Sequence, residues 1–306
     1  MRGGRIDPMK FPEGALDADD RIDLAIAESF PASDPPSWNA GIETTDEWRV
    51  PEIVAATDLS DCSGNALDHA IALSRATGAG LTVVHARSDA PDYDDLYRTG
   101  IRESASSTPR YSDLYADAFD PAPAFAYDEE AFAALVRTHR HQLDGLSRVR
   151  QLAIAGDPVD AILDTAQRAG AAIIIIGSRA RGIVARALLG STADAVIRRS
   201  GVAVLAVPGD SRWEEGGVVV AVLDQPDVAR HVLRHAATIA GALRAELATL
   251  RVPEDGHVDQ RAEVRNARLV VIALPRDETQ PVNRRDPNVD VLLRSGLCPV
   301  LTVPVN

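Results

Sequence analysis

The chain has 306 residues, of which 45% are hydrophobic and 25% charged, a composition that is ordinary for a soluble globular protein of about two domains. Its formal net charge is −13. This acidic balance argues against a general affinity for nucleic acid or for anionic membranes, because binding to phosphates depends on clustered lysine and arginine. We expect a cytoplasmic protein, since no secretory signal and no apolar run of roughly 18 residues is visible.

The two cysteines, Cys62 and Cys298, form no CxxC pair. They therefore predict neither a disulfide framework nor a cysteine-based zinc site. We expect both to be buried, reduced thiols.

Strands and helices alternate from residue 53 onward. The hydrophobic patterns predict strands at 53–57, 81–84, 149–155, 171–176 and 202–207, and helices at 61–77, 128–147, 158–169 and 191–200. Uninterrupted apolar strands that alternate with helices indicate an α/β fold with a parallel sheet. The connection at 87–127 shows no periodicity and contains all five tyrosines. It is interpreted either as a lid or partner-binding surface or as a loop that packs on its own domain.

The sequence also repeats itself. Residues 53–86 align without a gap on residues 219–252, and residues 171–178 align on residues 267–274. The second copy is shorter, because it has lost the region between its second and fourth strands. The repeat predicts a flexible arm, a complete domain, a linker and a degenerate second domain, at residues 1–47, 48–208, 209–217 and 218–306.

A candidate phosphate loop, GSRARGIVARALLGS, occupies residues 177–191 between the most apolar strand and a helix. Its glycines let backbone N–H groups approach an anion, and the helix that follows adds free N–H groups and the positive end of its dipole. It is not a Walker A loop, because Ile183 and Val184 stand where that motif needs Lys and Ser or Thr. We expect a ligand here, at the carboxyl ends of the strands.

Residues 52–208 resemble a universal stress protein domain of the UspA superfamily. The motifs that carry the resemblance are ATDLS at 56–60, LTVVHA at 81–86, GDPVDAILDTA at 156–166 and the loop and helix at 177–207. Residues 218–306 are similar to a second, degenerate copy. The resemblance implies two tandem open parallel sheets of strand order 3-2-1-4-5, the second truncated. It also implies binding of ATP, with or without Mg²⁺, through a G-x2-G-x9-G-[ST] loop.

The family's binding residues transfer by position. The resemblance implies that Asp58 contacts adenine or ribose and that Ala86 offers backbone groups to the adenine edge. Gly177 opens the loop, and Gly190 and Ser191 bind phosphate through backbone N–H and hydroxyl groups. At most one nucleotide per chain is expected, because the second copy lacks the loop.

Three positions leave alternatives open. Ala180 stands where the family has its middle glycine; a positive φ there would cost alanine about 1–2 kcal/mol, although Gly182 could supply the lost flexibility. Asp58 could instead cap the next helix or close a turn, and Ser191 begins an S-x-x-D capping box with Asp194.

The histidines show no catalytic pattern. His85 is expected to be a partly buried structural residue, and His139 and His141, two apart on a helix, do not share a face. No Ser-His-Asp, HExxH or paired-carboxylate arrangement is visible, so at most weak ATP hydrolysis is expected. The favoured function is a nucleotide-binding stress regulator. The alternatives are a protein that acts through contacts with an unidentified protein partner without nucleotide and, less favoured, an enzyme of phosphoryl transfer or hydrolysis.

The resemblance also predicts how the two copies meet. In the family the fifth strand pairs across a dimer axis, and a tandem chain can satisfy that edge internally. Residues 202–207 and 299–303 should therefore lie side by side as an internal pseudo-dimer. A homodimer of tandem chains is also compatible with the sequence.

Overall fold

A computed structural model describes residues 49–87, 126–127, 129–146, 148–178, 189–223, 226–252, 258–275 and 286–305. The predicted arm, most of the tyrosine-containing connection, Ala180 and Asp224 lie outside these residues.

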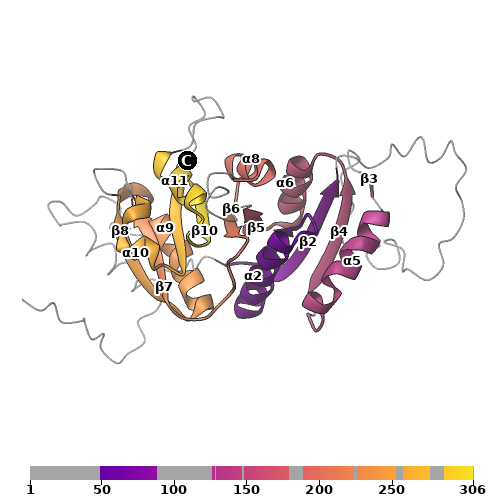
Figure 1. Cartoon of the computed structure of the whole chain (residues 1–306), viewed down its shortest axis with the longest axis horizontal. Coiled ribbons are helices and arrows are strands. Elements are labelled where there is room, and N and C mark those ends of the chain that lie inside the picture. Colours follow the sequence, from indigo (N-terminus) through magenta and orange to yellow (C-terminus); the bar gives the residue numbers. More distant parts are fainter. Residues whose placement is uncertain are drawn as a thin grey trace, which may run out of the picture.

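Strands and helices alternate along the first half of the chain (Figure 1). They are β1 (Glu52–Ala56), α2 (Asp61–Thr77), β2 (Gly80–Arg87), β3 (Ala126–Tyr127), α5 (Glu129–Leu143), β4 (Val149–Ala155), α6 (Pro158–Ala169), β5 (Ile173–Ser178), α8 (Ser191–Arg199) and β6 (Ala203–Pro208). The second half contains β7 (Val218–Leu223), α9 (Pro226–Leu243), β8 (Glu246–Arg251), the 3-10 turn η2 (Val258–Gln260), α10 (Ala262–Arg265), β9 (Leu269–Pro275), α11 (Pro287–Ser295) and β10 (Val300–Val305).

The described strands form one sheet in the order β3-β4-β2-β1-β5-β6-β10-β9-β7-β8. Within the first half, the parallel strands β4-β2-β1-β5-β6 have the predicted order 3-2-1-4-5. The second half has β10-β9-β7-β8, which is the same order without its third strand. The predicted fold class, two tandem open sheets with the second truncated, is therefore confirmed.

The two halves join through β6 and β10, which pair in antiparallel fashion with Leu205 opposite Leu301. Thr302 adds a side-chain bond across this junction, because its hydroxyl donates to the backbone oxygen of Val204 at 3.2 Å. The two strands predicted to lie side by side do so. All strands of both halves consequently belong to one continuous sheet.

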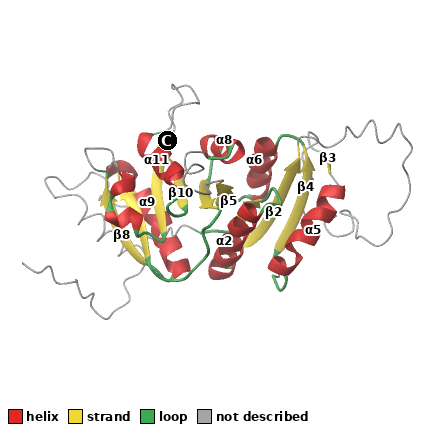
Figure 2. Cartoon of the chain, viewed as in Figure 1, coloured by secondary structure: helices red, strands yellow, loops and turns green. Residues whose placement is uncertain are grey.

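Helices cover both faces of the sheet, with α2, α5 and α9 on one face and α6, α8 and α11 on the other (Figure 2). One core includes buried leucines from both halves, among them Leu67 of α2 and Leu233 of α9. Because helices bury both faces of the sheet, the inner strands β6, β7 and β9 contain only apolar residues, which explains their uninterrupted runs in the sequence.

Helix caps explain most of the predicted boundaries. Asp157 caps α6 by accepting the N–H groups of Val159 and Asp160, and Pro158 takes the first helical position, as expected. Gly78 ends α2 with a φ of 71°. The other boundaries differ by a few residues, most clearly for α5, which ends at Leu143, and for β2, which extends from Gly80 to Arg87.

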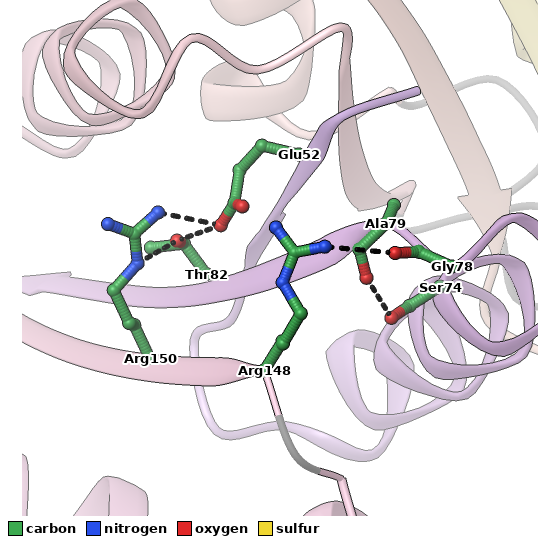
Figure 3. Close-up of polar contacts among 7 residues, drawn as sticks. All are labelled: Glu52, Ser74, Gly78, Ala79, Thr82, Arg148 and Arg150. Carbon is green, nitrogen blue, oxygen red and sulfur yellow. Dashed lines mark hydrogen bonds and ion pairs between the residues drawn. The ribbon is translucent and has the colours of Figure 1, made fainter. Parts of the chain in front are cut away.

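A polar cluster lies near the amino ends of three strands (Figure 3). Glu52 Oε1 of β1 accepts bonds from the Thr82 hydroxyl at 2.7 Å and from the Arg150 guanidinium at 2.8 Å. The carboxylate is buried, and an added side-chain atom at Gly80 would lie 2.1 Å from Glu52 Oε2. A side chain at position 80 would therefore force the Glu52 carboxylate, held by Thr82 and Arg150, to move.

None of the described helices is both long enough and apolar enough to cross a membrane.

Candidate functional site

A pocket of about 270 Å³ lies at the carboxyl ends of β1, β2 and β5, opposite the Glu52 cluster. Five of the six residues singled out from the sequence line it: Asp58, Ala86, Gly177, Gly190 and Ser191. The sixth, Ala180, lies outside the described residues. The fold therefore brings together residues that are up to 133 positions apart in the sequence, from Asp58 after β1 to Ser191 at the start of α8.

Part of the pocket lining is apolar. Ala56, Val84, Ala86 and Ile176 contribute from the strand ends, Pro158 and Ile162 from α6, and Ala193 from α8. The other lining residues are polar or glycine: Thr57, Asp58, Ser60, Cys62, Ser63, Gly177, Gly190, Ser191 and Thr192. Such a lining suits a ligand with an apolar part and a polar or charged part.

The turn between β1 and α2 presents Asp58 at the pocket. Asp58 Oδ1 accepts the backbone N–H of Ser60 at 3.1 Å and also the Ser60 hydroxyl. The cap of α2 is Ser60, whose hydroxyl oxygen accepts the N–H of Ser63. Of the two structural interpretations of Asp58, closing a turn is therefore right and capping the helix is wrong. The Asp58 side chain remains exposed beside the pocket.

The start of α8 also lines the pocket. Its N-cap is Gly190, which has no side chain to make a capping bond. The alternative of a capping box between Ser191 and Asp194 is wrong, because Ser191 is already the first helical residue and Asp194 instead binds Arg198 one turn later. Among the described residues, the first turn of α8 therefore has no side-chain cap from its N-cap position.

Gly177 approaches the start of α2 closely. A side-chain carbon at this position would lie 3.2 Å from the backbone oxygen of Cys62 and 3.3 Å from its Sγ. The Cys62 thiol donates to the backbone oxygen of Ser178 at 3.4 Å.

The two cysteines differ in their surroundings. Cys62 is half-buried and lines the pocket, so the expectation of a buried thiol is wrong there. That expectation holds for Cys298, whose burial raises the pKa of its thiol to about 12.

Two histidines flank Thr57. His85, which is buried as a structural residue, donates from Nδ1 to the Thr57 backbone oxygen at 2.8 Å. His139 Nε2 lies 3.0 Å from the Thr57 hydroxyl, while His141 on the same helix is exposed. The sequence reasoning missed Thr57, Ser63 and His139 as parts of the site. The polar run after β1 was a signal for the first two, but nothing in the local pattern marks His139.

No group of three or more histidine, cysteine or acidic side chains in the described residues could hold a metal ion.

The equivalent position in the second half has a different cap. Helix α11 begins after Asp286, whose carboxylate accepts the N–H groups of Asn288 at 2.8 Å and Val289 at 3.4 Å. Val258 of η2 is fully buried in the core that includes α11.

Comparisons with known proteins agree with this architecture. A model of the Universal stress protein family matches residues 51–208. The stress response protein NhaX of Bacillus subtilis is 30% identical over 168 residues, which cover 52% of this chain and 99% of NhaX.

Solved structures share the fold across both halves. A functionally unknown protein of Pseudomonas aeruginosa PAO1 aligns with 83% of this chain and 92% of its own, with a TM-score of 0.57 and 16% identity. A universal stress protein of Archaeoglobus fulgidus DSM 4304 aligns with 84% of this chain and 99% of its own, with a TM-score of 0.53 and 14% identity. Since its family match spans more than half of its residues, this chain belongs to the universal stress protein family.

Proposed function

We propose that the first half of this chain binds ATP or a related adenine nucleotide, and that it does so as a stress-response regulator. The observation that carries the proposal is the pocket that joins the Asp58 turn, the end of β2 at Ala86 and the uncapped start of α8. Many members of the family bind ATP through the loop that residues 177–191 resemble.

Each part of the pocket suits one part of a nucleotide. The apolar part of the lining, which includes Val84, Ile162 and Ile176, suits the face of a base. The exposed carboxylate of Asp58 can accept hydrogen bonds from ribose hydroxyl groups. The backbone N–H groups at the start of α8 suit phosphate, because they coincide with the positive end of the helix dipole.

We expect at most one nucleotide per chain. In the second half the Asp286 carboxylate already occupies the start of α11 and would repel phosphate. The buried Val258 adds an apolar side chain close to the same helix.

The test is titration calorimetry of the purified full chain with ATP, ADP, cyclic AMP and GTP, with and without Mg²⁺. Binding of an adenine nucleotide at a stoichiometry near one, with weaker binding of GTP, is the expected result. Mass spectrometry of denatured protein would identify any nucleotide that co-purifies. The absence of binding by all four nucleotides would instead favour the alternative, a protein that acts through contacts with other proteins.

A further inference from the structure

A chain of side-chain hydrogen bonds runs from the wall of the pocket into α5. The Thr57 hydroxyl lies 3.0 Å from His139 Nε2, and His139 Nδ1 lies 2.6 Å from Gln142 Oε1. His139 is only 1% exposed. A buried ring with a partner on each nitrogen is held in one orientation.

The partners of Gln142 determine the direction of these bonds. Its Nε2 donates to Asp68 Oδ1 at 2.8 Å and to the backbone oxygen of Gly64 at 3.3 Å. Oε1 therefore faces His139, and Nδ1 of that ring carries the hydrogen. In the neutral ring Nε2 is then an acceptor, and the Thr57 hydroxyl can donate to it. The Ser63 hydroxyl, 3.0 Å from the Thr57 oxygen, is the second partner of this group and also donates to the Ser60 backbone oxygen.

The same hydroxyl holds the turn that carries Asp58. Because its hydrogen points to His139, its lone pairs are available to accept the N–H of Leu59, which lies 3.0 Å away. Leu59 has a φ of 64°, a conformation uncommon for a residue other than glycine. This strained residue lies between Asp58 and Ser60, and both of these line the pocket.

We propose that His139 is a positioning residue of the nucleotide site, although it does not line the pocket. It orients the Thr57 hydroxyl, which holds Leu59 in its strained conformation and thereby presents Asp58 to the ligand. The proposal rests on the proposed function, because it assigns His139 a role in binding the same nucleotide. It also links α5, on one face of the sheet, to a pocket at the ends of the strands.

The first test compares ATP affinity in three variants of the full chain, each at a temperature where circular dichroism shows it folded. His139→Phe fills the space of the ring but cannot accept a hydrogen bond, and Thr57→Val removes the hydroxyl at nearly constant volume. Each should weaken binding about 10-fold, the effect of losing one well-placed hydrogen bond. The double variant should bind no more weakly than Thr57→Val alone, because that change already removes the hydroxyl that His139 orients.

A variant that restores the hydrogen bond distinguishes a positioning role of His139 from a role in packing alone. His139→Gln places an amide near the position of Nε2 and should bind ATP within about 3-fold of the unmodified chain. The matched control is His141→Gln on the exposed side of the same helix, which should leave the affinity unchanged. If folded His139→Phe binds ATP like the unmodified chain, the role of His139 in binding is refuted.

A double-mutant cycle between Asp58 and His139 tests whether His139 acts on binding through Asp58. Asp58→Asn should weaken binding in the unmodified chain but have little further effect in the His139→Phe chain, in which Asp58 is no longer presented. Equal losses in both chains would show that the two residues act independently.

A final measurement does not depend on the nucleotide. Amide exchange at Leu59 should be at least 10-fold faster in His139→Phe than in the unmodified chain, because a Thr57 hydroxyl that His139 no longer orients holds the Leu59 N–H less well. If the unmodified chain binds no nucleotide, the proposed function fails and His139 has no nucleotide to position. The exchange rate then still decides whether His139 holds the turn.

Discussion

The starts of α8 and α11 show how two copies of one fold have come to differ. Each helix follows a central strand and precedes the strand at the junction, so the two occupy equivalent places. The N-cap of α8 is Gly190, which has no capping side chain, whereas the N-cap of α11 is Asp286, whose carboxylate accepts two backbone N–H groups. The proposed function uses the first helix start for phosphate, and the second is occupied by a carboxylate of the chain itself.

The comparison indicates that a helix start can lose a proposed anion site without damage to the fold. An aspartate N-cap stabilises a helix by about 0.5–2 kcal/mol relative to alanine, but by only a few tenths of a kcal/mol relative to glycine, the residue at the N-cap of α8. The caps of the two helices therefore differ more in charge than in stability.

The largest expected effect comes from transferring the cap. Gly190 has a φ of −58° and a ψ of 142°, which any residue can adopt, so Gly190→Asp should fold with α8 capped as α11 is. ATP affinity should fall at least about 100-fold, because the carboxylate takes the N–H groups and repels phosphate. Calorimetry is the measurement. The matched control, Asp286→Gly, should leave ATP binding intact, and a Gly190→Asp chain with normal affinity would contradict the proposed site.

The next effect concerns two histidines at equivalent positions, His69 in α2 and His235 in α9. Each is buried with Nδ1 2.8 Å from the backbone oxygen four residues earlier. Burial lowers the pKa of His69 and lowers that of His235 to about 4. The ring of Trp213 contacts the ring of His69 edge to face, with ring centroids 5.7 Å apart.

These lowered pKa values predict acid instability with a definite sign. The folded state favours neutral histidine, so the stabilisation is complete above about pH 6.5 and is lost as the pH falls toward 4. His235 alone should cost about 2 kcal/mol of unfolding free energy between pH 6.5 and 5. Denaturant titrations at both pH values should show this loss of unfolding free energy in the unmodified chain and a smaller loss in His235→Leu. The exposed His141→Gln serves as the control; an equal loss in His235→Leu would refute the assignment.

A smaller effect is expected at the Glu52 cluster. Glu52 pairs in register with Gly80 in the first half, and Val218 pairs with Glu246 at the corresponding place in the second. Gly80→Ala should lower the unfolding free energy by about 1–3 kcal/mol, because the new methyl group meets the Glu52 carboxylate. Thermal or denaturant unfolding measures it.

The second half suggests the control for this cluster. Glu52→Val introduces valine, the residue type of Val218 at the corresponding place. In the Glu52→Val background, Gly80→Ala should then lower the unfolding free energy much less. An undiminished cost would show that something other than the carboxylate requires glycine.

The smallest effect concerns Ala180, for which the sequence predicts a penalty if its φ is positive. Ala180→Gly should then tighten ATP binding by a few fold, and titration should still give one nucleotide per chain. Asp224→Ala, in the second half, should change nothing. A stoichiometry near two, or a loss of binding in Asp224→Ala, would contradict the one-site proposal.

The sequence predicts the repetitive parts of this molecule well and the particular contacts poorly. The bounds of α2, α6 and β4 match the predictions because caps and apolar runs are local signals. The alternative that Ser191 caps α8 is wrong, since serine and glycine are both common at N-caps and only the backbone angles distinguish the two positions. The bond between Thr57 and His139 joins residues 82 positions apart, and no local pattern encodes such a contact.

The antiparallel junction of β6 and β10 has a consequence for how the chain unfolds. Leu205 and Leu301 pair across the junction although they are 96 positions apart in the sequence, so closing the junction carries a large loop-closure entropy. One hydrophobic core runs across it, and neither half can expose its share without disrupting the other. The chain should therefore lose its structure in a single cooperative transition and not as two independent domains.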